Sequence, residues 1–529
     1  MNFRKIGILL VLLAGVLILY PAYNVQLGLT QGDNGRDFYC FKETFDGALP
    51  YRDYWWVYGP LMPFYYGFFY KFFGVNISSV LFGKMALNLL SGLLVYLSLS
   101  MYTSAVIAVL AALWLWIFGP DFTYTYNHIG GIFLMLSVVY FMFLYIKDAR
   151  RRFIWAGAFL CFLLSLVKIN IGFSTLAGFL GLVLLKEARE KTLNTQKKKA
   201  IFYSGALAAA ASGLAYGLLI YDLPLYYIRQ CFPYLKSDHP INVTILESFK
   251  MLWNAFFYNS TSSLPNLFFG LTVFLCAVKG LLDSRQKTGE RKLWVPLLAA
   301  LVFLSALNMH EFFASGIYYR IFWISPLIIM LHFMIIFIGT RDFSRVIKYS
   351  VYLVLFILVS LQGLEKHRLL KAYQIPPQYL AFEAGKAYVT NPPEWMDTVI
   401  KTTRYLQSRL KKEESFLALP YDPLYYFLAG KESPVRELNF FEHINIKEGQ
   451  QRDIIRRLEE KNTNWIVLSS RSNSPVRGLG EFGKDYGIVL SEYIKDHFEL
   501  VETFGDWQTP PRKAFEHHGV KIFRRITPL

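Results

Sequence analysis

Apolar runs long enough to cross a lipid bilayer recur from the N-terminus to about residue 362. The hydrocarbon core of a bilayer is about 30 Å thick, so a helix of about 20 mostly apolar residues spans it. The sequence predicts eleven spans, at residues 6–22, 76–98, 103–118, 129–146, 153–168, 171–186, 200–221, 265–282, 293–309, 321–339 and 345–362. We therefore expect an α-helical polytopic membrane protein.

The composition agrees with this expectation. The 529 residues are 54% hydrophobic, 17% aromatic and only 18% charged, which is too apolar for an ordinary soluble protein of this length. Much of the net charge of +17 falls in short loops between the predicted spans. Because no basic stripe interleaved with aromatic residues stands out, we expect no nucleic-acid partner.

Lysine and arginine residues predict the orientation in the membrane. Four basic loops fall on the same side as Arg4 and Lys5, at residues 147–152, 186–199, 285–292 and 341–348. The positive-inside rule assigns this side to the cytoplasm. The opposite side receives the loops at residues 23–75, 119–128, 222–264 and 310–320. With eleven spans, the C-terminal region also lies outside the cytoplasm.

The C-terminal region has mixed composition and alternating helix and strand signals. Helices are expected at residues 396–410, 450–460 and 492–498, and strands at residues 415–419, 465–468, 500–504 and 520–523. This order predicts a small α/β domain. The region has no glycine-rich phosphate loop and no HExxH or GxSxG motif, so nothing in it indicates an independent catalytic site.

The four cysteines and the first apolar run allow further expectations. Cys161 and Cys276 lie in predicted spans, whereas Cys40 and Cys231 lie in predicted outer loops and could pair. No CxxC or zinc-binding spacing is present. The first apolar run lacks a convincing cleavage site, so we interpret it as a retained span rather than a signal peptide.

The loop that follows the first span is unusually rich in chemistry-bearing residues. Residues 32–63 contain four aspartates, two arginines and a run of aromatic residues, and residues 61–74 form an aromatic stretch too short to span. Tyr and Phe prefer the membrane interface, so we expect residues 61–74 to lie there. Carboxylates beside a bilayer surface indicate chemistry on a lipid-borne substrate.

Motifs in this loop resemble the first-loop signature of the GT-C glycosyltransferases. The matching elements are residues 33–36 (DNGR), 47–53 (GALPYRD) and 59–61 (GPL), and residues 168–172 (KINIG) and 421–434 (YDPLYYFLAGKESP) also look like the family. The chain is most similar to the glycosyltransferase family 39 type, with protein O-mannosyltransferases and the lipid A aminoarabinose transferase as relatives. The resemblance implies a plasma (inner) membrane enzyme. Residues 1–363 would form its catalytic transmembrane region and residues 364–529 an extracytoplasmic α/β domain.

The resemblance also implies a general base. In this family the first-loop aspartate is the base, and this role carries over to Asp33. The second acidic position of the family is Asn34 in this chain, which leaves altered or lost activity open. Asp37 lies one helical turn from Asp33, so the two carboxylates share a face if the loop is helical. Either could be the base, and we expect it to be Asp33.

The substrate implied by the resemblance is a polyprenyl-phosphate sugar, with a lipid, glycan or protein outside the cytoplasm as acceptor. A carboxylate can deprotonate the acceptor hydroxyl, and fixed cations can stabilise the departing phosphate. The candidate substrate-binding residues are Arg36, Arg52, Asp53, Tyr58, Lys168 and Arg320. Direct attack by the acceptor implies inversion at the anomeric carbon, because double displacement needs a second carboxylate as nucleophile.

Structural interpretations stay open for some of these residues. Asp53 could anchor the loop through Arg52, and Tyr58 could be an interfacial anchor rather than a sugar contact. Lys168 ends an apolar run and could extend to the interface at little cost. No cofactor is identified, and no metal site is expected. His310 and Glu311 could hold a divalent cation, but the sequence offers no second ligand pair.

Two other classes of function compete with a transferase. A polyprenol-lipid transporter or flippase would also have many spans, but such proteins usually carry ionisable residues deep in their spans or inverted repeats. A non-catalytic membrane scaffold displaying the C-terminal domain is the other alternative. The acidic first loop favours the glycosyltransferase.

Overall fold

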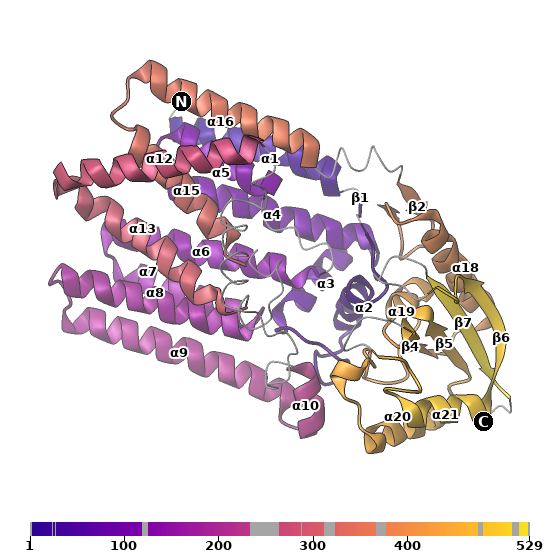
Figure 1. The fold of residues 1–529 in the computed structure, drawn as a ribbon. Coiled ribbons are helices and arrows are strands. Elements are labelled where there is room, and N and C mark those ends of the chain that lie inside the picture. The colour runs from indigo at the N-terminus through magenta and orange to yellow at the C-terminus, as the bar shows by residue number, and fades with distance from the viewer. Residues whose placement is uncertain are drawn as a thin grey trace.

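The structure is a computed structural model. It describes residues 3–23, 25–26, 28–118, 125–232, 264–286, 288–311, 323–366, 377–473, 480–509 and 518–526. Long helices make up most of the molecule, and a smaller part containing a β-sheet covers one end of them (Figure 1). The chain therefore has the expected fold class, a helical membrane protein with a C-terminal α/β part.

Each of the eleven predicted spans coincides with a helix in the described residues. These helices are α1 (Phe3–Tyr23), α4 (Ile77–Leu99), α5 (Ala105–Phe118), α6 (Asn127–Asp148), α7 (Arg151–Ser165), α8 (Ile169–Arg189), α9 (Thr195–Ile220), α12 (Leu264–Gln286), α13 (Thr288–Asn308), α15 (Ser325–Thr340) and α16 (Arg345–Lys366). Within the described part of the chain, α4, α6, α8 and α9 are long and apolar enough to cross a membrane. The molecule is thus a multi-pass membrane protein, and the number eleven stays a prediction.

The predicted outer loop at residues 23–75 contains two helices. These are α2 (Asp33–Phe45) and α3 (Leu61–Phe73), which are joined by residues 46–60. In α3 a buried face carries Tyr66 and Tyr70, whereas Phe64, Phe68 and Phe72 on another face are exposed. Spacings of four residues put each set on one side of the helix. The exposed phenylalanines suit the predicted position at the membrane interface, which remains a prediction.

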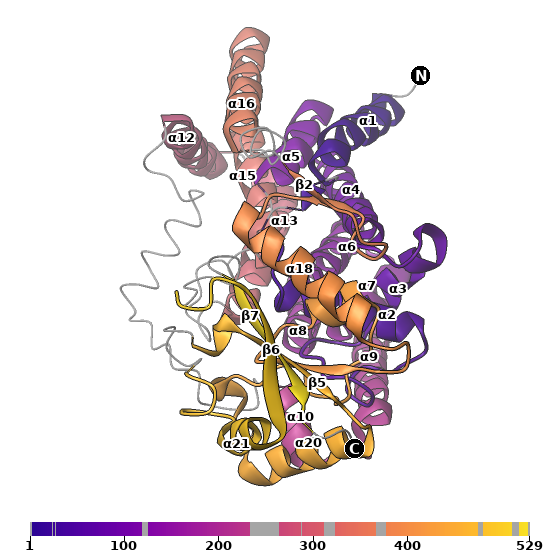
Figure 2. The same ribbon diagram turned by 90° about the vertical axis from the view of Figure 1, so that its right-hand side faces the viewer.

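The C-terminal part forms the expected α/β layers. Strands β4 (Phe416–Leu419), β5 (Trp465–Ser469), β7 (Gly519–Arg525) and β6 (Phe498–Gly505) form one sheet in the order β4-β5-β7-β6. The β4–β5 pair is parallel and the other two pairs are antiparallel. The surrounding helices are α18 (Pro393–Arg409), α19 (Leu424–Ala429), α20 (Glu448–Glu460) and α21 (Ile488–His497), with short turns η3 (Glu442–Ile444) and η4 (Ser470–Ser472). Figure 2 shows this part face on.

A second, small sheet ties the end of α1 to the C-terminal part. Strand β1 (Val25–Gln26) pairs in parallel with β3 (Ala387–Val389), which pairs antiparallel with β2 (Gln378–Leu380). Next to it, the Leu29 amide donates to Asn391 Oδ1 at 2.8 Å, and Asn391 Nδ2 donates to the Leu29 carbonyl at 2.7 Å. The first loop and the C-terminal part are therefore joined directly in front of α2.

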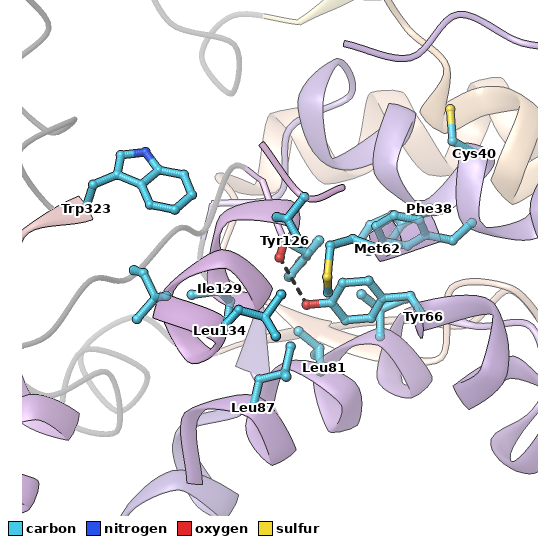
Figure 3. Close-up of a cluster of buried hydrophobic side chains, with 14 of the residues drawn as sticks. Phe38, Cys40, Met62, Tyr66, Leu81, Leu87, Tyr126, Ile129, Leu134 and Trp323 are labelled. Carbon is cyan, nitrogen blue, oxygen red and sulfur yellow. Dashed lines mark hydrogen bonds between the residues drawn. The ribbon is translucent and has the colours of Figure 1, made fainter. Parts of the chain in front are cut away.

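The core beneath the first loop combines aromatic with aliphatic and sulfur-containing side chains (Figure 3). The rings of Phe41 and Tyr66 stack with centroids 4.6 Å apart. The Tyr66 hydroxyl donates to the Tyr126 carbonyl at 3.1 Å, which satisfies the phenol at the bottom of this apolar cluster. Buried residues from α2, α3, α4 and α6 meet here, so the core fixes α2 against the long helices.

The disulfide considered from the sequence is not formed. Cys40 on α2 and Cys231 at the end of α10 (Leu225–Cys231) are both buried and free, as are the other two cysteines. The Cys40 thiol lies instead 3.7 Å from the carbonyl oxygen of Trp55.

Candidate active site

The N-terminal turn of α2 brings the predicted base and its neighbours together. Asp33 is the first residue of the helix, and the Arg36 amide donates to the Gly32 carbonyl at 2.7 Å to close the first turn. Negative side chains in the first turn suit the helix dipole. Asp33, Arg36 and Asp37 therefore lie on neighbouring positions at one end of α2, as the sequence predicts for a helical loop.

Arg36 holds both carboxylates. Its Nη1 donates to Asp33 Oδ1 at 3.2 Å, while its Nε and Nη2 donate to Asp37 Oδ1 at 3.0 and 2.7 Å. The guanidinium also lies over the rings of Tyr58 and Trp56, 5.0 and 5.5 Å from their centroids. A buried guanidinium with ion-pair and cation–π partners is rigidly held. Arg36 consequently fixes the geometry of the two carboxylates.

The two carboxylates differ in access. Asp37 is fully buried, its Oδ1 accepts from Arg36, and its Oδ2 accepts from the Tyr126 amide at 2.8 Å. Burial raises the pKa of Asp37, and Arg36 and the Tyr126 amide oppose this rise. The Asp33 side chain is 43% exposed. Within the described residues, its Oδ2 has no hydrogen-bond partner, so Asp33 is the carboxylate open to a substrate.

Tyr421 from the C-terminal part provides a second hydrogen-bond donor to Asp33. Its hydroxyl donates to Asp33 Oδ1 at 3.0 Å and accepts from Arg36 Nη1 at 3.0 Å. Burial raises the pKa of Tyr421 well above its usual value, so the hydroxyl stays a neutral donor. The sequence showed residues 421–434 only as a family-like stretch. It gave no signal for this contact, which spans 388 positions.

Helix α19, just after Tyr421, packs directly on α2. The rings of Phe38 and Phe427 lie 5.4 Å apart, and those of Tyr39 and Tyr426 lie 5.3 Å apart. The approach requires a glycine, because a Cβ at Gly35 would lie 2.3 Å from the Leu424 backbone nitrogen. The stretch 421–434 is thus a packing element for the first loop.

Arg471 is a second residue that the sequence did not single out. It lies half-buried, its Nη1 donates to the Tyr421 carbonyl at 2.9 Å, and its guanidinium is 5.0 Å from the Phe441 ring. A Cβ on Gly32 would lie 2.7 Å from its Nη1. Arg471 therefore places a cation beside the start of α2 and steadies Tyr421.

A row of rings connects Arg36 to Lys168. Tyr58 lies 4.9 Å from His128, His128 lies 4.9 Å from Trp323, and Lys168 Nζ lies 5.4 Å from the Trp323 ring. The turn before α8 is fixed to the first loop, since the Val167 carbonyl accepts from the Gly59 amide at 2.9 Å. Lys168 thus lies across an aromatic row from the carboxylates.

Lys168 is already paired. It is buried, and its Nζ lies 2.6 Å from Glu311 Oε2, which gives the site another carboxylate. Glu311 also accepts from Asn170, and His310 lies 3.0 Å from Asn170 Nδ2. Within the described residues, no group of three or more His, Cys, Asp or Glu side chains could hold a metal ion.

Lys84 is a further buried cation near these residues. It is fully buried in α4, and its Nζ lies 5.5 Å from the Tyr126 ring centroid. The Tyr126 amide donates to Asp37, so Tyr126 links Lys84 to the carboxylate cluster. A buried cation in a helix long enough to span a membrane is usually functional.

Other predicted residues lie elsewhere. Arg52 and Asp53 form an exposed pair, with Nε and Oδ1 3.1 Å apart, and Asp53 Oδ2 accepts from the Leu49 amide at 2.7 Å. The neighbouring Tyr54 hydroxyl meets Thr44 near the far end of α2, about 12 Å along the helix from Arg36. The structure therefore does not bring this pair to Asp33. Arg320 lies outside the described residues.

The acidic position occupied by Asn34 faces the loop interior. Asn34 is buried, and its Oδ1 accepts from the Thr30 amide at 2.9 Å and from the Thr30 hydroxyl at 3.2 Å. Its side chain closes the turn that leads into α2.

Comparison with known proteins identifies similar ones. Residues 58–216 match the family described as dolichyl-phosphate-mannose-protein mannosyltransferase, a segment that begins after Asp33 and Arg36. No curated protein matches the chain. The chain is similar to the crystal structure of ArnT from Cupriavidus metallidurans bound to undecaprenyl phosphate, with 10% identity, 97% of each chain covered and a TM-score of 0.61. For the apo state of the same protein the identity is 11%, the coverage 98% of each chain and the TM-score 0.45.

At 10% identity, the likeness to the undecaprenyl-phosphate-bound structure shows a shared fold. The family match covers residues 58–216, so the chain is similar to membrane glycosyltransferases of the GT-C type in its fold and in that segment.

Proposed function

We propose that the protein transfers a sugar from a polyprenyl-phosphate donor to an acceptor outside the cytoplasm, with Asp33 as general base. The observation that carries the proposal is the state of the Asp33 carboxylate. One oxygen is fixed by Arg36 and Tyr421, and the other has no partner among the described residues. The relative solved with undecaprenyl phosphate supports the donor class, and the family match supports sugar transfer.

In the proposed reaction, Asp33 accepts the proton of an acceptor hydroxyl lying within hydrogen-bond reach. The hydroxyl oxygen attacks the anomeric carbon from the face opposite the phosphate. The bond between that carbon and the phosphate oxygen breaks, and polyprenyl phosphate leaves. One displacement inverts the anomeric centre. Asp37 is unsuited as a nucleophile because both of its oxygens are engaged.

The departing phosphate needs positive charge nearby. Arg36, Lys84 and Lys168 are the cations proposed for this task, and Tyr58 would form part of the wall between them. Because Lys168 is paired with Glu311, its contribution would be that of a polarised ion pair rather than a full charge. Arg320 keeps its predicted role. The exposed pair of Arg52 and Asp53 would suit contact with an acceptor better than with the phosphate.

The proposal includes a location and a division of the chain. Residues 1–363 would lie in the plasma membrane with a cytoplasmic N-terminus, and residues 364–529 would form a domain outside the cytoplasm. The predicted outer loop 23–75 then faces the same side as the domain that contacts it. The small sheet that joins β1 to β3 agrees with this arrangement.

The test is release of undecaprenyl phosphate from undecaprenyl-phosphate-linked sugars by purified protein in nanodiscs, supplied with envelope glycolipids as acceptors. We expect Asp33→Asn to lower turnover by about 100-fold or more while donor binding persists. Asp46→Asn is the matched control, because Asp46 lies in the same loop in a surface ion pair with Lys42. Unchanged turnover in a folded Asp33→Asn variant would refute the assignment of Asp33 as the general base. Movement of labelled lipid across vesicles without sugar release would favour the transporter.

A further inference from the structure

A polar cleft lies between α10 of the helical part and the segment that leads into α20. Its lining residues are Tyr226, Arg229, Gln230, His443, Ile444, Asn445, Lys447 and Gln450, and its volume is about 170 Å³. Helices α10 and α20 lie side by side at one edge of the boundary between the two parts (Figures 1 and 2). The predicted functional residues do not include any residue of this cleft.

The lining is basic and rich in amides. It contains two permanent cations, Arg229 and Lys447, and three side-chain amides, but no carboxylate. Neither cation forms an ion pair with any described residue. Two neighbouring carboxylates pair with other cations, since Glu437 lies 3.0 Å from Arg457 and Glu448 lies 2.6 Å from Arg452. Two uncompensated cations facing one hollow attract an anion.

The cleft is part of the built interface rather than a loose surface feature. Gln230 is buried, with 7% of its surface exposed, and its Nε2 lies 3.4 Å from Gln450 Oε1. The same Gln450 oxygen accepts from the Lys447 amide at 2.9 Å at the start of α20. These contacts fix the two walls relative to each other, and the exposed side chains of Arg229 and Lys447 line the space between them.

The cleft also lies close to Asp33. His443 stacks on Phe441 at 6.0 Å, Phe441 meets Tyr421 edge-on at 6.2 Å, and Tyr421 binds Asp33. On the other side, the Trp55 indole donates to the Gln230 carbonyl at 3.1 Å and lies 6.1 Å from Tyr421. Two aromatic rings therefore separate the cleft from the proposed base.

We propose that this cleft binds a phosphoryl group carried by the acceptor. The inference rests on the proposed transferase function. Arg and Lys with amide donors match phosphate oxygens. A volume of about 170 Å³ is small beside the roughly 300–1,000 Å³ of pockets that hold whole drug-sized ligands, so it suits one charged group. The donor phosphate belongs with the cations beside the long helices, which leaves the C-terminal side for the acceptor.

The experiment measures binding of inorganic pyrophosphate to the full chain in nanodiscs of uncharged lipid by titration calorimetry. Arg229→Ala and Lys447→Ala should each weaken binding about tenfold, the factor expected from one lost charge-assisted hydrogen bond. Arg456→Ala is the control. It removes the same charge from α20, but Arg456 is exposed, lies outside the cleft and pairs with Asp453 and Glu460. Undecaprenyl phosphate should not displace the pyrophosphate.

Absence of pyrophosphate binding by the wild type, or equal affinity in all variants, would overturn the cleft as an anion site. Displacement by undecaprenyl phosphate would overturn the assignment to the acceptor, because it would place the anion in the donor site. Binding needs no turnover. If the wild type binds pyrophosphate in the cleft but releases no undecaprenyl phosphate from the donor, the transferase function and the acceptor assignment are refuted. The anion site would stand.

Discussion

At the scale of single residues, Tyr421 and Arg36 decide what Asp33 can do. Both donate to the same Asp33 oxygen and leave the other one open. The sequence identified Asp33 and Arg36 by their motif. The residues alone left both Asp33 and Asp37 as possible bases, because both lie within three residues of Arg36, and only the family resemblance favoured Asp33. The structure distinguishes the two by burial, because Asp37 is covered by the core around Tyr126 whereas Asp33 is partly exposed. Tyr421 could not be predicted because tyrosines in a family-like stretch look like core residues.

Tyr421→Phe removes one hydrogen bond to Asp33 and preserves the ring. We expect turnover to fall about tenfold with donor binding unchanged. Steady-state release of polyprenyl phosphate and a donor-binding titration check both effects. Unaltered turnover would assign Tyr421 to packing alone.

Asp422, the next residue, makes stability depend on pH. Burial raises its pKa to about 6, although Arg471, Ser469 and the Tyr421 amide oppose the rise. The folded state then binds more protons than the unfolded state between about pH 4 and pH 6, so this group lowers stability as the pH rises through that window. The penalty is complete above pH 6 and amounts to about 1–3 kcal/mol.

Asp422→Asn should therefore be more thermostable than the wild type at pH 7.5, and the difference should shrink toward pH 4.5. The Asn side chain can still accept from the Ser469 hydroxyl, which lies 2.7 Å from Asp422 Oδ2. Thermal midpoints in nanodiscs at four pH values measure the effect. A difference in thermal midpoint that does not change with pH would contradict the raised pKa of Asp422 as its cause.

At the scale of elements, the contact of α2 with α19 is the feature that hydropathy could not indicate. The long apolar helices were predictable because each carries an uninterrupted apolar run. The C-terminal strands were predictable because β-branched and aromatic residues cluster between turns. Helix α2 is polar in composition but almost wholly buried, since partners far along the chain cover it. Strands β1 to β3 have only two or three residues each, too few for a periodic signal.

Gly35→Ala tests this contact. The added Cβ would lie 2.3 Å from the Leu424 nitrogen, so α19 and Tyr421 must shift. We expect a loss of about 1–3 kcal/mol in stability and reduced turnover. Gly67→Ala in α3 is the control, because its Cβ would meet nothing closer than 3.5 Å and alanine favours a helix. Equal thermal midpoints and equal turnover for the two variants would contradict a close α2–α19 approach.

At the scale of the whole molecule, the helical part and the C-terminal part both contribute residues to the candidate site. The sequence predicted both parts and their order, because composition changes sharply after the last apolar run. It could not predict that the C-terminal part supplies a hydrogen bond to Asp33, closes a sheet with β1 and walls the cleft beside α10. Each of these depends on contacts between residues more than 200 positions apart, for which a single sequence contains no signal.

The pairing of Asp33 with Tyr421 across 388 positions has a consequence for biogenesis. A ribosome adds about 5–20 residues per second, so the predicted base emerges roughly 20–80 seconds before the tyrosine that orients it. During that interval the predicted first loop would wait at the bilayer surface without its partner. On the proposed function, the nascent chain would attack the lipid-linked sugars around it more slowly until its last domain is made, so translation itself would delay full activity.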